Sequence, residues 1–500
     1  MKIDEFPSDI RTYILPEPSG EMYYRCMGCN KEFDILRLLY TCPACGSVLL
    51  LHSRNVPVFD RLDGERWRKI FDYRRMLNHK AIKGIFRFYE FIAPIIPLDQ
   101  IVYLGEGHTP LVEANATLKK EVGLDFYFKN DGLNPSASFK DRGMACALSY
   151  INFMAGREKT GDILAICAST GDTSASAALY AAYLGDFVKS AVLLPEGKVT
   201  PQQLSQPLGS GARVLEIPGV FDDCMKVVEC LAETYHVALL NSKNSWRILG
   251  QESFSYEIAQ DFDYEVENKA ILVPIGNAGN ITAVMSGFLK FFRAGLIDHL
   301  PKIVGVQSEH ADPVYRYYME NDPDKRRFLP VSVRPSVAQA AMIGNPVSMP
   351  RVVELVQQYN RAAGKKSTFV VQVTEQEIMD AMIVANRNGN IACTQGGESF
   401  AGLKKAIRAG YIEPDDVGVL DSTAHVLKFS GFQEMYFKDS FDPDFEVNPR
   451  ADLRNEPIRL RYQALSNCSS PGRPPTGKTF ECLVGEIAEE IAKILDLKKK

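Results

Sequence analysis

Between about residues 106 and 435, short apolar runs rich in β-branched and aromatic residues alternate with longer stretches of helical composition. Such alternation predicts an α/β fold built on parallel sheet, with helices covering its faces. Ligands of these sheets bind at the carboxyl ends of the strands, so the loops after the apolar runs are where function is expected. The runs lie at residues 126–130, 163–167, 188–194, 213–217, 271–273, 303–306 and 417–420.

The composition leaves room for a large core and argues against several classes of protein. Hydrophobic residues make up 46% of the 500 residues and charged residues 24%, as in ordinary globular proteins. A formal net charge of -5 provides no general attraction for nucleic acid. The N-terminus lacks a secretory pattern, and no apolar run approaches the roughly 20 residues that a membrane helix needs. We therefore expect a cytoplasmic protein that binds neither nucleic acid nor membranes.

Four of the 11 cysteines form two closely spaced pairs near the start of the chain. Cys26 and Cys29 make the first CxxC pair, and Cys42 with Cys45 makes the second. Four thiolates at this spacing can complete a tetrahedral Zn²⁺ site, and a short segment with little core gains folding energy from the metal. Residues 21–52 are therefore predicted to be a zinc-ribbon-like unit that supports a larger enzyme. Four reduced structural cysteines are the alternative.

Changes in composition suggest the other boundaries. Residues 53–105, rich in aromatic and basic side chains, are predicted to be a connecting arm packed on a neighbouring domain. Residues 106–440 form the α/β region, and residues 441–500 form a C-terminal extension with an amphipathic helix at 480–497. Residues 472–479, GRPPTGKT, match the Walker A pattern. No β-rich run precedes this match and its prolines remove amide donors, so we expect a linker there.

One lysine lies in a motif that favours unusual chemistry. Residues 134–143 read NPSASFKDRG, which places Lys140 after a turn and near the start of a helix. The positive end of a helix lowers the pKa of an ammonium group and favours nucleophilic or proton-transfer roles. Taken alone, however, such a lysine is usually a solvated surface charge.

Three further loops, each following an apolar run, carry polar or glycine-rich sequences. Residues 168–174, ASTGDTS, offer hydroxyls and the free amides of a helix N-terminus, which together suit an anion. Residues 274–280, PIGNAGN, expose successive amides that suit a phosphate monoester. Residues 419–425, VLDSTAH, supply a carboxylate, hydroxyls and an imidazole. Each loop alone is also compatible with an ordinary capped turn, so the interpretation depends on their occurring together.

Taken in order, these motifs resemble those of the fold-type II pyridoxal-phosphate enzymes and, within them, the threonine synthase family. The resemblance spans roughly residues 100–435 and includes NSKNSWR at 241–247 and GQE at 250–252. It implies a fold like that of the tryptophan synthase β subunit, with two α/β subdomains and the cofactor between them. It also implies a homodimer.

The resemblance further implies roles for individual residues. Lys140 holds pyridoxal 5′-phosphate as a Schiff base and afterwards carries protons. Asp172 faces the 3′-oxygen of the cofactor, where many relatives have Asn. Thr423 meets the pyridine nitrogen, although Asp421 would share its face if the strand continued. The cofactor phosphate is held by the backbone amides of Gly276, Asn277, Ala278, Gly279 and Asn280. The substrate phosphate is held by Ser169, Thr173, Ser242 and Arg247.

The reaction implied by the resemblance is that of threonine synthase, EC 4.2.3.1, a carbon-oxygen lyase of threonine biosynthesis. It converts O-phospho-L-homoserine and water to L-threonine and phosphate. Cysteate synthase, which joins O-phospho-L-serine and sulfite, is similar to the same family, and the phosphate-binding residues do not separate the two. Another fold-type II lyase and a non-catalytic zinc-ribbon binding protein are the remaining alternatives.

Overall fold

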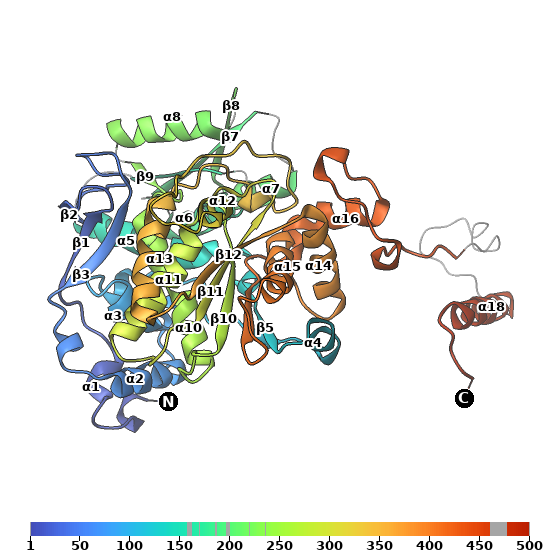
Figure 1. Ribbon diagram of the computed structural model, residues 1–500, viewed down its shortest axis with the longest axis horizontal. Coiled ribbons are helices and arrows are strands. Elements are labelled where there is room, and N and C mark those ends of the chain that lie inside the picture. The colour runs from blue at the N-terminus through green and yellow to red at the C-terminus, as the bar shows by residue number, and fades with distance from the viewer. Residues whose placement is uncertain are drawn as a thin grey trace. The chain divides into compact units, whose positions relative to one another are not determined.

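The computed structural model describes residues 2–157, 163–169, 171–185, 188–196, 201–219, 221–235, 237–460 and 478–499. Residues Met1–Leu453 form one compact unit, and Arg454–Lys500 form a second. The first unit contains one antiparallel sheet and two mainly parallel sheets, with helices packed around them (Figure 1). Within the described ranges, no helix combines the length and the hydropathy that crossing a membrane requires.

The larger sheet has six strands in the order β12-β11-β10-β13-β5-β4. All neighbours are parallel except β4 and β5, which pair antiparallel. Every residue of β10 is buried, as expected of a parallel strand whose two faces are both covered. The strands are β4 (Leu111–Glu113), β5 (Phe126–Lys129), β10 (Lys269–Pro274), β11 (Lys302–Ser308), β12 (Thr368–Val373) and β13 (Val417–Asp421).

Helices cover both faces of this sheet. The helices α14 (Glu375–Arg387) and α15 (Thr394–Arg408) pack on one face and share a buried apolar cluster with it. On the other face lie α11 (Gly279–Arg293) and α13 (Met349–Ala363). The predicted α/β architecture with parallel sheet is therefore confirmed.

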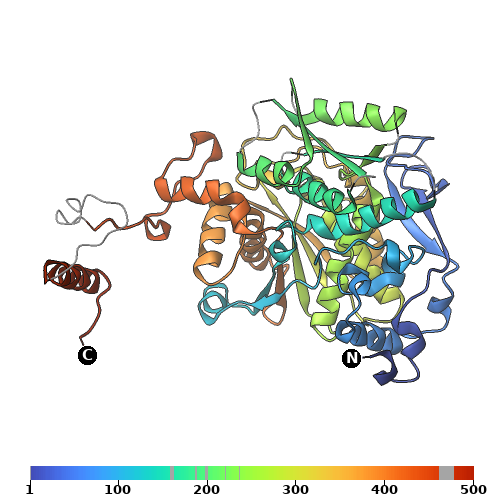
Figure 2. The same cartoon turned by 180° about the vertical axis from the view of Figure 1, so that it is seen from behind.

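The smaller sheet has four parallel strands in the order β8-β7-β6-β9. Helix α5 (Lys140–Arg157) packs against both α6 and α9 (Ser245–Gln251), and α9 also contacts α11 of the larger sheet. Figure 2 shows the same helices and strands from behind. The remaining elements are β6 (Ile163–Ala168), β7 (Val188–Pro195), β8 (Arg213–Ile217), β9 (Val237–Leu239), α6 (Asp172–Leu184), α7 (Pro201–Gly209) and α8 (Phe221–Thr234).

Helix α9 approaches α5 closely because Gly250 has no side chain. A Cβ atom there would lie 2.2 Å from the carbonyl oxygen of Arg142 and 2.7 Å from the Cβ of Cys146. Backbone and side chain of α5 would both have to move to admit even a methyl group. The glycine therefore fixes the distance between the helix that begins at Lys140 and the helix that carries Arg247.

The N-terminal antiparallel sheet consists of β1 (Glu21–Cys26), β2 (Glu32–Asp34) and β3 (Leu49–Arg54). It is joined to the larger body by buried hydrogen bonds. The indole Nε1 of Trp246 donates to the Tyr24 hydroxyl at 2.9 Å. The guanidinium of Arg351, on α13, donates twice to the Leu49 carbonyl and also to the Ser242 carbonyl. The ribbon thus contacts the segment that includes the predicted substrate residues.

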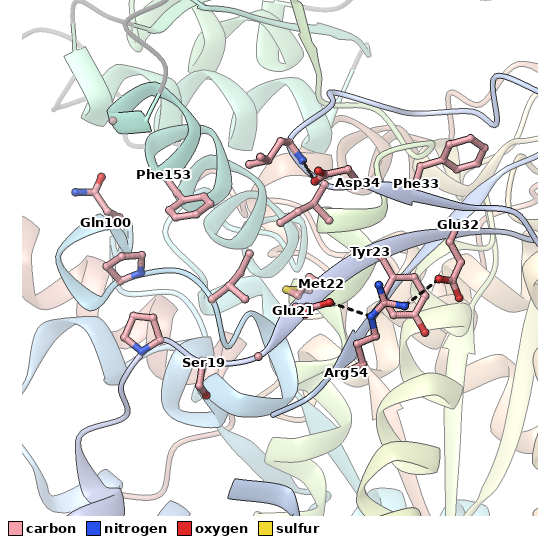
Figure 3. Close-up of a pocket in the computed structure, with 17 residues that line it drawn as sticks. Ser19, Glu21, Met22, Tyr23, Glu32, Phe33, Asp34, Arg54, Gln100 and Phe153 are labelled. Atoms are coloured by element: carbon pink, nitrogen blue, oxygen red, sulfur yellow. Dashed lines mark hydrogen bonds and ion pairs between the residues drawn. The ribbon is translucent and has the colours of Figure 1, made fainter. Parts of the chain in front are cut away.

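A cavity of about 910 Å³ opens between this ribbon and the carboxyl end of α5. Tyr23, Asp34 and Phe153 are among the residues that line it (Figure 3). Arg54 bridges Glu21 and Glu32 on the ribbon side, at 3.1 Å from each. None of the predicted cofactor or substrate residues lines this cavity.

Residues 53–105 pack against the larger sheet's helices through aromatic side chains. Phe71 and Phe91 contact Phe291 of α11, and Phe91 also contacts Tyr256 of α10 (Ser253–Asp261).

At the other end of the first unit, the amide of Asn448 donates to Gln376 of α14 at 2.7 Å. The chain therefore stays attached to the α/β body up to Leu453.

The second unit contains α18 (Lys478–Ile494), which exposes apolar side chains including Val484, Ile491 and Ile494. The helix that was expected at 480–497 thus starts two residues earlier and ends three residues earlier. Residues 472–477 of the Walker A match lie outside the described residues.

A buried arginine ties the start of α5 to two other parts of the fold. The guanidinium of Arg142 lies 2.7 Å from Oδ1 of Asp131, after β5, and 2.7 Å from Oε1 of Glu257, on α10. All three side chains are almost inaccessible to solvent. Burial alone would raise the pKa of Glu257, but Arg142 and Lys129 hold it well below its usual value.

We expect Arg142→Met to lower the free energy of unfolding by about 3–5 kcal/mol, because it leaves the buried carboxylate of Asp131 without its cation and Glu257 with Lys129 alone. Urea unfolding monitored by the fluorescence of the buried Trp67 and Trp246 measures the change. Lys438→Met, which breaks an exposed pair with Glu434, serves as the control and should leave the midpoint nearly unchanged. Equal urea midpoints for the two variants would contradict the structural role of Arg142.

Candidate active site

The four predicted loops meet between the two parallel sheets, at the carboxyl ends of their strands. The amide of Phe139 donates to the Thr423 carbonyl at 2.8 Å, which joins the lysine motif to the loop after β13. The Asn280 side chain donates to Asp421 at 2.6 Å, which joins that loop to the start of α11. Residues from distant parts of the chain therefore surround the first turn of α5.

Lys140 is the first residue of α5 and is half-buried. Its ammonium nitrogen lies 4.1 Å from the centroid of the Phe139 ring. Burial and the nearby guanidinium of Arg247 lower the pKa of Lys140 to about 7, although Asp172 and Asp421 oppose the shift. A lysine with this pKa has a large neutral fraction near pH 7, which both imine formation and proton transfer require.

The predicted cofactor-phosphate loop forms the N-terminus of α11. Ala278 has a left-handed backbone with φ of 60°, and the helix starts at Gly279. No backbone amide from Gly276 to Asn280 donates a hydrogen bond to another described residue. A Cβ atom on Gly276 would lie 3.0 Å from the Cα of Ala341, so there is little room for a side chain at this position. Unused amides at the start of a 15-residue helix suit a phosphate group.

The strand β13 and the loop after it place Asp421 and Thr423, the two residues considered for the pyridine nitrogen, in different surroundings. Strand β13 ends at Asp421, so the alternation of faces does not continue to Thr423. Asp421 accepts from Asn280, and burial raises its pKa well above the ordinary value. The Thr423 side chain is buried, with its hydroxyl 3.7 Å from the sulfur of Cys393. The hydroxyl of Thr423 therefore stays the better candidate for the ring nitrogen.

Arg247 is the strongest anion-binding group near Lys140. Its guanidinium is buried and donates to the Leu240 carbonyl at 3.1 Å, while Nε has no hydrogen-bond partner. No carboxylate among the described residues pairs with it, and burial lowers its pKa to about 10. A buried guanidinium without a counter-ion attracts a phosphate or carboxylate that can accept from two of its nitrogens.

The other predicted substrate residues lie in neighbouring loops. Ser169 and Thr173 are half-buried on either side of Gly171, and the Ser169 hydroxyl accepts from the Gly171 amide at 3.2 Å. Ser242 is half-buried, and its carbonyl accepts from Arg351. Thr170, between Ser169 and Gly171, lies outside the described residues. The side-chain hydroxyls of Ser169, Thr173 and Ser242 thus flank the site, and Arg247 provides its positive charge.

Two side chains in this region were missed by the sequence analysis. Lys428 forms an ion pair with Asp172, with 3.1 Å between Nζ and Oδ1. Cys393 caps α15 and contacts Thr423. Lys428 lies only three residues beyond the predicted VLDSTAH segment, but no local pattern links it to Asp172, which is far away in the chain. Only the three-dimensional fold brings the pair together.

The four N-terminal cysteines also lie together, apart from this site. Their sulfur atoms are within 4.8 Å of one another. The Cys26 and Cys45 sulfurs are 3.4 Å apart and those of Cys29 and Cys42 3.6 Å apart, with no disulfide between them. Backbone amides of Gly28 and Cys29 donate to the Cys26 sulfur. This geometry suits a tetrahedral metal ion.

We expect Lys140 to react with an amine-selective reagent in the cofactor-free protein with a pH midpoint near 7. Exposed lysines should become reactive only near the usual lysine pKa of about 10.4. Labelling at a series of pH values, read by peptide mass spectrometry, measures the midpoint. Arg247→Met removes a neighbouring positive charge and should raise it. A midpoint near 10 in the unmodified chain would contradict the electrostatic account of Lys140.

Comparison with known proteins agrees with this geometry. Residues 102–422 match the family model described as pyridoxal-phosphate dependent enzyme. The threonine synthase of Methanocaldococcus jannaschii is 36% identical over 441 residues, which are 88% of this chain and 96% of that protein. The threonine synthase of Methanosarcina acetivorans is 33% identical over 412 residues, which are 81% of this chain and 92% of that protein.

Solved structures support the fold. Threonine synthase from Escherichia coli has a TM-score of 0.62 at 18% identity and covers 85% of this chain and 95% of that one. Diaminopropionate ammonia lyase from Escherichia coli has a TM-score of 0.56 at 14% identity and covers 72% of this chain and 92% of that one. The expectation of a fold-type II architecture is thus confirmed. The chain belongs to the pyridoxal-phosphate dependent enzymes and, among them, to the threonine synthase family.

Proposed function

We propose that this chain converts O-phospho-L-homoserine and water to L-threonine and phosphate. The observation that carries the proposal is the buried guanidinium of Arg247, which pairs with no carboxylate among the described residues and lies close enough to Lys140 to lower the pKa of its amine. An amine for the chemistry and a cation for the substrate's phosphate are thereby placed side by side. The relatives that match most of the chain are named threonine synthases, which supports threonine as the product.

The residues present fit pyridoxal 5′-phosphate. The unused amides of 276–280 would hold its phosphate, and the Lys140 amine would bond to its aldehyde. The buried Thr423 hydroxyl would face the ring nitrogen, and Asp172 the 3′-oxygen. When bound, the cofactor supplies an electron sink that stabilises negative charge on the carbons of the substrate.

The chain's own residues then have three tasks. Lys140, freed when the substrate amine replaces it, removes protons at Cα and then at Cβ, and its pKa near 7 suits both acid and base roles. Arg247 and the neighbouring hydroxyls hold the phosphate, which leaves with the bonding electrons when the Cγ–O bond breaks. Lys140 then returns one proton to Cγ, a water molecule adds its hydroxyl at Cβ, and the remaining proton returns to Cα.

We expect the purified enzyme with pyridoxal 5′-phosphate to release phosphate from O-phospho-L-homoserine and to form threonine, as measured by a phosphate assay and by chromatography. Lys140→Ala should lower kcat by at least about 10²–10⁴-fold because the proton carrier is lost. Arg247→Met should raise KM by about tenfold or more because charge-assisted hydrogen bonds to the phosphate disappear. Lys365→Ala, an exposed lysine, is the matched control.

Incubation with O-phospho-L-serine and sulfite is the second arm of this assay. Formation of cysteate from that pair, without threonine from O-phospho-L-homoserine, would overturn the proposal in favour of cysteate synthase. Release of phosphate without threonine would likewise overturn it, since the added water would then not reach Cβ.

We further propose that Cys26, Cys29, Cys42 and Cys45 bind a structural Zn²⁺ ion. Their sulfurs converge, and the ribbon that carries them packs on α9 through Tyr24 and Trp246. The metal would stabilise a segment that has only a small core of its own.

Protein purified without chelator should contain about one zinc per chain by plasma mass spectrometry, as a tetrahedral four-cysteine site binds one ion. Cys42→Ser should lose the metal and lower the unfolding temperature, because the ribbon loses its cross-link. Cys230→Ser, at an exposed cysteine outside the cluster, is the control and should keep the metal. Zinc-free wild-type protein of unchanged stability would contradict the metal site.

A further inference from the structure

Lys428 lies outside the motifs identified in the sequence, yet its ammonium group reaches into the candidate site. It belongs to η9 (Val426–Phe429), the turn that follows β13, and its side chain is only 14% exposed. Its Nζ lies 3.1 Å from Oδ1 of Asp172, 2.8 Å from Oε1 of Gln206 and 2.9 Å from the carbonyl oxygen of Ser136. Two hydrogen bonds, to Gln206 and Ser136, and one ion pair with Asp172 thus fix the ammonium group in one position.

These three partners come from different parts of the fold. Asp172 is the first residue of α6 and Gln206 lies in α7, and both helices pack on the smaller sheet. Ser136 lies in the loop just before Lys140, whereas Lys428 follows a strand of the larger sheet. Lys428 therefore connects the two sheets beside the catalytic lysine.

We propose that Lys428 is a positioning residue that balances the negative charge of Asp172 and thereby sets the protonation of the bound cofactor at its 3′-oxygen. This inference rests on the proposed function, in which Asp172 faces that oxygen. A buried carboxylate beside an oxygen that becomes negative would disfavour its deprotonation. An ammonium group paired with the carboxylate removes most of that repulsion, and its fixed position keeps the carboxylate oriented.

Other charged or titratable groups near the pair do not replace Lys428. Lys140 and Cys393 lie within electrostatic reach of Asp172, and Asp141 lies within reach of Lys428. Burial raises the pKa of the Cys393 thiol to about 11, so it is neutral at pH 7. In the proposed function the Lys140 amine would be bonded to the cofactor in the resting enzyme, and Asp141 adds negative charge. Lys428 is therefore the lysine that can balance Asp172 throughout the reaction.

The pH midpoint of the visible absorbance of the bound cofactor reports the charge around its 3′-oxygen. Lys428→Met should raise this midpoint by about 1–3 pH units, because the Asp172 carboxylate is then unbalanced. Asp172→Asn should lower it, because the ammonium group then acts alone. The double variant Lys428→Met/Asp172→Asn should return close to the wild-type midpoint, and Lys428→Arg should keep it.

A purely structural role for Lys428 would change stability without this reciprocal pattern. The cofactor-free variants are first compared by circular dichroism. Lys428→Gln, which retains a hydrogen-bond donor without the charge, replaces Lys428→Met if the latter does not fold. Lys438→Met, at an exposed ion pair, is the control and should leave the midpoint unchanged.

Unchanged midpoints in both single variants would overturn the role of Lys428 while leaving the proposed function intact, since the wild-type protein would still bind the cofactor. A wild-type protein that develops no cofactor absorbance would overturn both. Threonine formation by wild-type enzyme, measured in parallel, distinguishes these two failures.

Discussion

The pairing of Arg142 with Asp131 and Glu257 is the interaction on which the position of the candidate site depends. It joins the start of α5 to the end of β5 and to α10, in a region from which solvent is excluded. Lys140 lies two residues before Arg142, so the same contacts hold the reactive amine between the sheets. Because a buried ion pair is costly to break on one side only, small displacements of α5 are strongly disfavoured.

In the site that this arrangement creates, some charged side chains have a partner within the protein and one does not. Asp172 has Lys428 as its partner, and Asp421 is held by Asn280. Arg247, in contrast, has no carboxylate among the described residues, so its charge is available to a ligand. The same unbalanced charge also helps to lower the pKa of Lys140. Substrate attraction and activation of the lysine therefore have a common electrostatic origin.

The sequence analysis was most successful where short segments carry their own physical signal. Apolar runs predicted strands because parallel strands are covered on both faces, and Lys140 was correctly placed at a helix start. The glycine-rich loop at 274–280 predicted amides free to bind an anion, and the amides of residues 276–280 donate to no other described residue. Residue roles in the site stay predictions, since they depend on the bound cofactor and substrate.

The sequence by itself determined most of the parallel strands, though not β9 and β12, together with the loops at their ends and the membership of a family, because these depend on composition and spacing within short segments. The tertiary structure decided how charges pair. Asn280 was expected to serve through its amide, yet its side chain also binds Asp421, and Lys428 was not anticipated at all. Pairing across two sheets depends on how distant segments approach each other in space, and no local pattern encodes that approach.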